Sequence, residues 1–161
     1  MPSSAALDEQ VVVYVKRVRD LYANVRDWLA GATIHESETE VSEGSLATYV
    51  VPVLTVRRPS GLPVEFIPKG YRIIGGHGRV DLASRTGSET IVYVRAGGPQ
   101  LSIRERISED TREDTRATGS VSPLFPGIDR DGWVWVEQRL PGKARMLSSE
   151  VLARVLDLLD Q

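Results

Sequence analysis

The chain has 161 residues, of which 41% are hydrophobic and 26% are charged, and it carries a net charge of −2 and no cysteine. These proportions are typical of one soluble globular domain, and the missing cysteines exclude disulfides, zinc–thiolate sites and thiol nucleophiles. No apolar run is long enough to span a bilayer, and the N-terminus has neither the basic nor the apolar part of a signal peptide. We therefore expect a single domain over residues 1–161, in the cytoplasm and away from membranes.

The first strong pattern is an amphipathic stretch from Asp8 to Ala30, in which apolar side chains recur every three or four positions. This spacing predicts a helix with a broad apolar stripe, and Gly31 would end it. We expect residues 1–7 to be frayed and the stripe to pack on a sheet. Alternatively, the stripe contacts a protein partner or a second copy of the chain in a homodimer. The stripe comprises Val11, Val15, Val18, Tyr22, Val25 and Leu29, with Tyr14, Leu21 and Trp28 beside it.

Residues 32–45 contain His35 and four glutamates but no basic residue. We expect this polar segment to be solvated rather than to bind a metal, because no second histidine lies nearby. Apolar strands are predicted next, over residues 48–56, 64–67 and 71–74. Pro52 has no amide proton to donate, so its strand should lie at a sheet edge or carry a bulge.

Residues 78–107 are predicted to form three consecutive antiparallel strands, joined by two glycine-containing turns. A three-residue loop at 86–88 sets the register of the first pair, because it brings the apolar side chains of both strands to one face. The predicted core face of the three strands comprises Val80, Leu82, Val92, Val94, Leu101 and Ile103.

The opposite face of these strands is the candidate binding site. Between Arg57 and Arg106 the chain holds nine basic and four acidic residues, so this region is basic although the whole chain is slightly acidic. Arginine binds carboxylates and phosphates through paired hydrogen bonds, which favours a small anion or an acidic partner here. A GC-rich genome also raises the arginine content, and such side chains are then merely solvated. The candidate site comprises Arg79, Asp81, Tyr93, Arg95 and Arg104, with Arg79 directly opposite Arg95.

Residues 108–131 are polar, contain the tetrapeptide EDTR twice and include several glycines and prolines. This composition predicts a flexible loop that is dispensable for folding, with the apolar tripeptide at 124–126 as its exception. A last strand is predicted over residues 132–140. A short helix over residues 151–159 follows, with an apolar side formed by Leu152, Val155, Leu156 and Leu159.

These elements predict an α+β fold, with a mostly antiparallel sheet of five or six strands and both helices packed on one face. The glycines around His77 precede a strand, whereas phosphate-binding loops usually open a helix. No nucleophile–base pattern is visible, so we expect no enzymatic activity, no cofactor and no metal, and the net charge disfavours nucleic acid. The sequence favours a non-enzymatic interaction or scaffolding module. The alternative function is small-anion or acidic-partner binding on the arginine-rich face.

Overall fold

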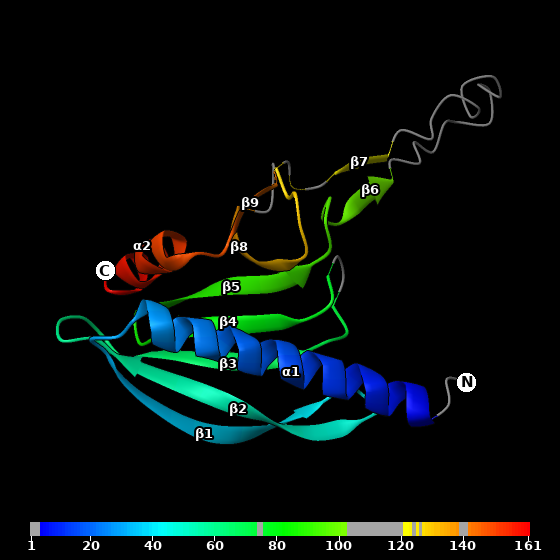
Figure 1. The fold of residues 1–161 in the computed structure, drawn as a ribbon, viewed down its shortest axis with the longest axis horizontal. Helices are drawn as coiled ribbons and strands as arrows, with labels where there is room; N and C mark the ends of the chain where they lie inside the picture. Colours follow the sequence, from blue (N-terminus) through cyan, green and yellow to red (C-terminus); the bar gives the residue numbers. More distant parts are fainter. Residues whose placement is uncertain (1–3, 74–75, 103–120, 124, 126, 139–141) are drawn as a thin grey trace.

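A computed structural model describes residues 4–73, 76–102, 121–123, 125, 127–138 and 142–161. Within these residues, two helices pack on a large antiparallel sheet (Figure 1). The α+β class, the long N-terminal helix and the short C-terminal helix are confirmed. The sheet has seven strands, rather than five or six.

The sheet has the strand order β1-β2-β3-β4-β5-β8-β9, and β6 and β7 form a separate pair. The strands are β1 (Thr33–Ser42), β2 (Thr48–Arg57), β3 (Val64–Gly70), β4 (Arg79–Ser84), β5 (Gly87–Val94), β6 (Gln100–Ser102), β7 (Val121–Pro123), β8 (Gly132–Gln138) and β9 (Lys143–Met146).

The long helix α1 (Ser4–Trp28) crosses one face of the sheet, and the short helix α2 (Ser149–Leu159) packs on the same core. The predicted apolar stripe of α1 faces this core, and Val18 and Val25 are fully buried. The four predicted apolar residues of α2 are buried as well. Helix α1 begins at Ser4, inside the segment that we expected to be frayed. Burial of these stripes therefore holds both helices on the sheet.

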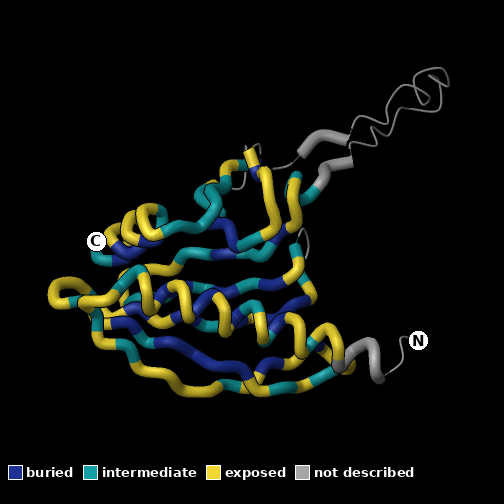
Figure 2. The backbone as a smooth tube through the Cα atoms, viewed as in Figure 1, coloured by how far each residue is buried: buried dark blue, intermediate teal, exposed yellow. Residues whose placement is uncertain are grey.

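Strand β1 was not predicted from the sequence, where residues 32–45 are a solvated polar segment. All ten residues of β1 pair with β2, although most of their side chains are exposed (Figure 2). A charged edge strand of this kind discourages pairing with other chains. Glu36 contacts Arg19 at 3.8 Å and Arg26 at 3.0 Å, and these two arginines lie on α1. The sequence prediction missed β1 because an edge strand needs few apolar residues.

The predicted register of β4 and β5 is wrong. Ser84 pairs with Gly87, so the turn has two residues, and Val80 faces Ile91 rather than Val94. Val92 and Val94 therefore lie on the sheet face opposite Val80. The physical reason is a second apolar cluster on that face, which makes both faces of β5 apolar. This cluster comprises Val94, Phe125, Ile128 and Val134, with Val92, Val136, Ala144 and Met146 at its margin.

We also predicted that the third of the three consecutive strands over residues 78–107 pairs with the second. This prediction is wrong, because β5 pairs with β8 instead. Gly97 and Gly98 both have positive φ, and β6 beyond them pairs with β7. Leu101, which was predicted in the core, pairs with Ser122 in this separate two-stranded sheet. Ile103 lies outside the described residues.

The described end of the segment 108–131, which was predicted to be a flexible loop apart from its apolar tripeptide, packs on the sheet. Phe125 and Ile128 are each only 7% exposed, and they cover the outer face of β5 and β8. The Ile128 carbonyl accepts a hydrogen bond from the Gly97 amide at 2.8 Å, and the Asp131 carboxylate accepts one from the Ala96 amide at 2.8 Å. Residues 108–120 lie outside the described residues.

Candidate functional site

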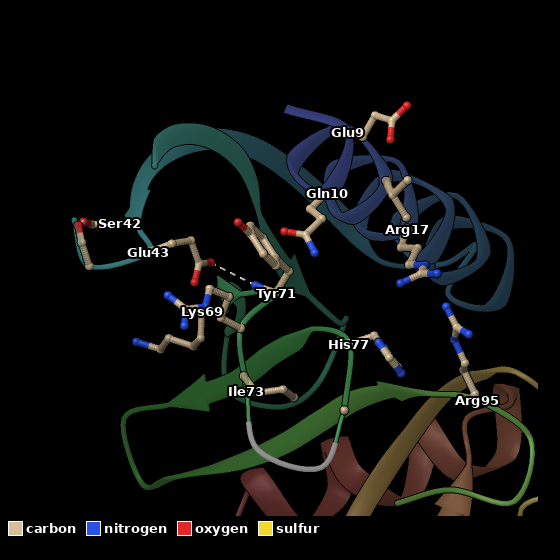
Figure 3. A pocket seen from close by; sticks show the side chains of 14 residues that line it. Glu9, Gln10, Arg17, Ser42, Glu43, Lys69, Tyr71, Ile73, His77 and Arg95 are labelled. Atoms are coloured by element: carbon tan, nitrogen blue, oxygen red, sulfur yellow. Dashed lines mark hydrogen bonds between the residues drawn. The ribbon is translucent and has the colours of Figure 1, made fainter. Parts of the chain in front are cut away.

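A hollow lies where α1, the β1–β2 turn and the β3–β4 connection meet. It has a volume of about 1040 Å³ and is named the basic cleft here (Figure 3). Its lining includes three arginines, one lysine, one histidine and two glutamates. These are Arg17, Lys69, Arg72, Arg95, His77, Glu9 and Glu43.

One wall of the basic cleft is built from tyrosines around a buried carboxylate. Glu43 is 7% exposed, and its Oε1 accepts hydrogen bonds from the Tyr49 hydroxyl at 2.7 Å and from the Tyr71 amide at 2.9 Å. The rings of Tyr49 and Tyr71 stack, with centroids 6.2 Å apart. Gly70, with φ +125°, passes under Glu43 so closely that an added Cβ would lie 2.2 Å from Oε1. This wall is therefore packed and internally bonded.

Tyr14 fixes the chain that connects this wall to β4. Its hydroxyl donates a hydrogen bond to the Arg79 carbonyl at 2.8 Å and accepts one from the Gly70 amide at 3.1 Å. A Cβ on Gly78 would lie 2.8 Å from the Tyr14 ring, so this position requires glycine. Burial raises the pKa of Tyr14, and burial followed by hydrogen bonding to Glu43 raises the pKa of Tyr49. Both phenols therefore stay neutral hydrogen-bonding groups at physiological pH.

The other end of the basic cleft gathers positive charge. Figure 3 shows the side chains of Arg17, His77 and Arg95 pointing toward one another from three separate segments. The Arg17 guanidinium lies over the Tyr93 ring, 4.1 Å from its centroid. The His77 amide donates a hydrogen bond to the Tyr93 carbonyl at 2.8 Å, which fixes the histidine beside the end of β5. We name Arg17, His77 and Arg95 the cation cluster.

Electrostatics in the cation cluster oppose a charged imidazole. Burial lowers the pKa of His77 below its usual value, the charges of Arg95 and Arg17 lower it further, and Asp131 acts in the opposite direction. An anion placed between the two guanidinium groups would reverse part of this effect, because an opposite charge favours the protonated form.

The arginines of the cation cluster have no carboxylate partner among the described residues. The same is true of Lys69 and Arg72, although Arg58, Arg79 and Arg145 all form ion pairs elsewhere in the molecule. Glu43 is occupied by Tyr49 and Tyr71, and Glu9 is exposed. Like charges that converge repel each other unless an anion lies between them, so this end of the basic cleft is suited to bind one.

The structure separates the site residues that were predicted from the sequence. Arg79 and Asp81 form a two-pronged ion pair, at 2.7 and 3.1 Å, and Arg79 pairs with Val92 rather than with Arg95. Tyr93 packs beneath Arg17 in the helix-covered layer, and Arg95 lines the basic cleft. Arg104 lies outside the described residues. The predicted pairing of Arg79 with Arg95 is therefore wrong, because it rested on the wrong register.

Sequence reasoning missed Arg17, Lys69, Arg72 and His77 as site residues. One signal pointed to His77, since it lies between two glycines that are needed for close packing. A Cβ on Gly76 would lie 2.4 Å from the Val92 side chain, and one on Gly78 would meet Tyr14. These two glycines thus allow the segment around His77 to pack closely against α1 and β5. No comparable signal marked the three cations.

Comparisons of the chain with protein-family models, with curated proteins and with solved structures found no match. Within the described residues, no three His, Asp or Glu side chains gather in a way that suits a metal ion. Neither helix, over its described length, is long and apolar enough to cross a membrane.

Proposed function

We propose that this protein is a non-enzymatic binding module that accepts an anionic group of a ligand or partner in the basic cleft, between Arg17, His77 and Arg95. The observation that carries the proposal is the convergence of these side chains without a carboxylate partner in the described part of the chain. A carboxylate or phosphate there would form charge-assisted hydrogen bonds with both guanidinium groups.

The packed wall supports this proposal because it holds the cleft open before a ligand arrives. Glu43 accepts hydrogen bonds from the Tyr49 hydroxyl and the Tyr71 amide, and the Tyr14 hydroxyl donates one to the backbone, so this wall does not collapse onto the cations. A preorganised site loses less free energy to ordering when it binds. The excess of four basic over two acidic side chains attracts anions to this end of the molecule.

Isothermal titration with sodium sulfate at low ionic strength tests the proposal. The native protein is expected to bind one sulfate, and Arg95→Ala should weaken binding by about ten- to a hundredfold, since a charge-assisted hydrogen bond contributes about 1.5–3 kcal/mol. Arg85→Ala is the matched control, because Arg85 is an exposed arginine in the β4–β5 turn and lies outside the basic cleft. Absence of sulfate binding, or equal binding by both variants, would contradict the proposal.

A further inference from the structure

A second hollow, of about 300 Å³, lies along the same side of α1 as the basic cleft. One wall comes from the second half of α1, and the other from the ends of β5, β8 and β9. We name it the aromatic groove, since two tryptophans and a tyrosine line it. Its main lining residues are Asn24, Trp28, Tyr93, Trp133, Met146 and Leu147.

Arg17 lines both hollows and forms the bridge between them. Its guanidinium covers the Tyr93 ring, and that ring meets Trp133 edge to face, with centroids 5.6 Å apart. The Trp133 indole nitrogen donates a hydrogen bond to the Arg17 carbonyl at 3.3 Å. A ligand group bound in the basic cleft at Arg17 would therefore lie close to a group bound in the aromatic groove.

The two hollows together are long. They follow α1 from Glu9 to Trp28, which corresponds to about 28 Å at 1.5 Å per helical residue. An extended peptide of about eight residues covers this length. A small anion would fill only the cation cluster and would leave the aromatic groove empty.

We propose that the basic cleft and the aromatic groove together bind one extended segment of a partner protein, which places an acidic residue in the cation cluster and an aromatic residue in the groove. This inference rests on the proposed function, because the acidic residue supplies the anion. Charge complementarity selects the acidic residue. Trp28, Met146 and Leu147 offer apolar surface to the aromatic one, and aromatic anchors of this kind dominate protein interfaces.

Polar side chains that flank these two anchors suit a peptide main chain. Gln10 and Asn24 lie on the exposed flank of α1, and each lines one of the two hollows. Side-chain amides both donate and accept hydrogen bonds, as a peptide backbone requires. The sequence of α1 thus places, along one flank, residues for a charge, for a main chain and for an aromatic ring.

Fluorescence polarisation with labelled octapeptides tests the inference. The probe carries two glutamates near its middle and a tryptophan about four residues further along, with glycine and serine elsewhere, and is made in both orders because the chain direction is open. Control peptides replace the tryptophan by alanine or the glutamates by lysine. The better of the two probes should bind the native protein at least about tenfold more tightly than either control.

Asn24→Trp fills the aromatic groove from an exposed helix position, and Ala23→Trp is its control on the solvent side of α1. Asn24→Trp should remove the advantage of the tryptophan peptide and keep sulfate binding unchanged, whereas Ala23→Trp should keep both. Arg95→Ala should weaken the binding of both the peptide and sulfate.

Three outcomes would overturn the inference. If the tryptophan and alanine peptides bind equally, or if Asn24→Trp behaves as Ala23→Trp, then the aromatic groove takes no part, although sulfate binding still supports the anion site. If adenosine monophosphate binds more tightly than the peptides and is lost in Asn24→Trp, the ligand is a nucleotide rather than a protein segment. If neither sulfate nor any acidic peptide binds, the proposed function fails as well.

Discussion

The two ends of the basic cleft differ in whether their charged side chains have partners within the protein. At the tyrosine wall, Glu43 is satisfied by a hydroxyl and an amide, so the carboxylate is part of the fold. At the cation cluster, Arg17 and Arg95 converge without a carboxylate partner in the described residues. Polar groups that are satisfied internally add stability, while charges left unmatched cost stability and are available to a ligand. We therefore assign stability to the first end and binding to the second.

The strongest test of this division removes the carboxylate of the wall. Glu43→Ala should lower the free energy of unfolding by about 3 kcal/mol, because it leaves the half-buried Tyr49 hydroxyl and the buried Tyr71 amide without an acceptor. Glu9→Ala, at the exposed rim of the same cleft, should change it by less than about 0.5 kcal/mol. Urea unfolding measures both, and a similar loss in the two variants would contradict the assignment.

A second test compares two tyrosines of the wall. Tyr49→Phe should destabilise by about 2 kcal/mol, since it removes a hydrogen bond to a charged group. The Tyr71 hydroxyl is buried and has no hydrogen-bond partner among the described residues. Tyr71→Phe should therefore be neutral, or stabilising by up to about 1 kcal/mol. Thermal unfolding distinguishes them, and a larger loss in Tyr71→Phe than in Tyr49→Phe would show that the wall is arranged differently.

A third test uses pH to examine the cation cluster. In the free protein, burial, Arg95 and Arg17 lower the pKa of His77, while Asp131 partly opposes them. A bound anion raises this pKa, so binding takes up a proton and sulfate affinity should increase as pH falls from 8 to 5.5. We expect roughly a fivefold increase, from about 1 kcal/mol gained by a charged donor.

Sulfate does not titrate in this pH range, so the dependence reports on the protein. His77→Gln should abolish it, and His35→Gln should preserve it, since His35 lies on the exposed edge strand β1. A dependence that persists in His77→Gln would assign the proton to another group.

The smallest effect is expected from removing one of the unmatched charges. Without any added anion, Arg95→Ala should be more stable than the native protein by about 0.5 kcal/mol at low ionic strength, because repulsion within the cation cluster is relieved. The gain should vanish at 1 M sodium chloride, where charges are screened. Arg85→Ala should show no gain at either salt concentration, and urea unfolding of the native protein and both variants at each concentration measures these differences. Destabilisation by Arg95→Ala would mean that Arg95 is bonded within the fold.

The sequence predicted those parts of the fold that bury one apolar stripe. The stripes of α1 and α2 have helical spacing, and both are buried as expected. It could not predict the register of β5, because Val92 and Val94 face one apolar cluster while Ile91 faces another. The alternation of apolar and polar residues along a strand identifies its buried face only when the other face is polar. Strand β1 was missed for the opposite reason, since it buries little on either face.

The candidate site was only partly accessible to sequence reasoning. Arg95 was named, and the basic excess of the middle of the chain was recognised. The cation cluster, however, joins α1, the β3–β4 connection and the end of β5, and its members are far apart in the sequence. Their meeting depends on how α1 crosses the sheet, which no local pattern encodes.

The pairing of β5 with β8 has a consequence for how fast the chain folds. Strands β1 to β5 are joined in sequence order, but Val94 pairs with Gly132 only after residues 95–131 have closed a loop. Each halving of such a loop lowers its closure cost by about 0.6 kcal/mol. A chain shortened within this segment, with Phe125 and Ile128 retained, should therefore fold faster at nearly unchanged unfolding rate. Docking of β8 would then be a late step of folding, and the fluorescence of Trp133 and Trp135 would report it.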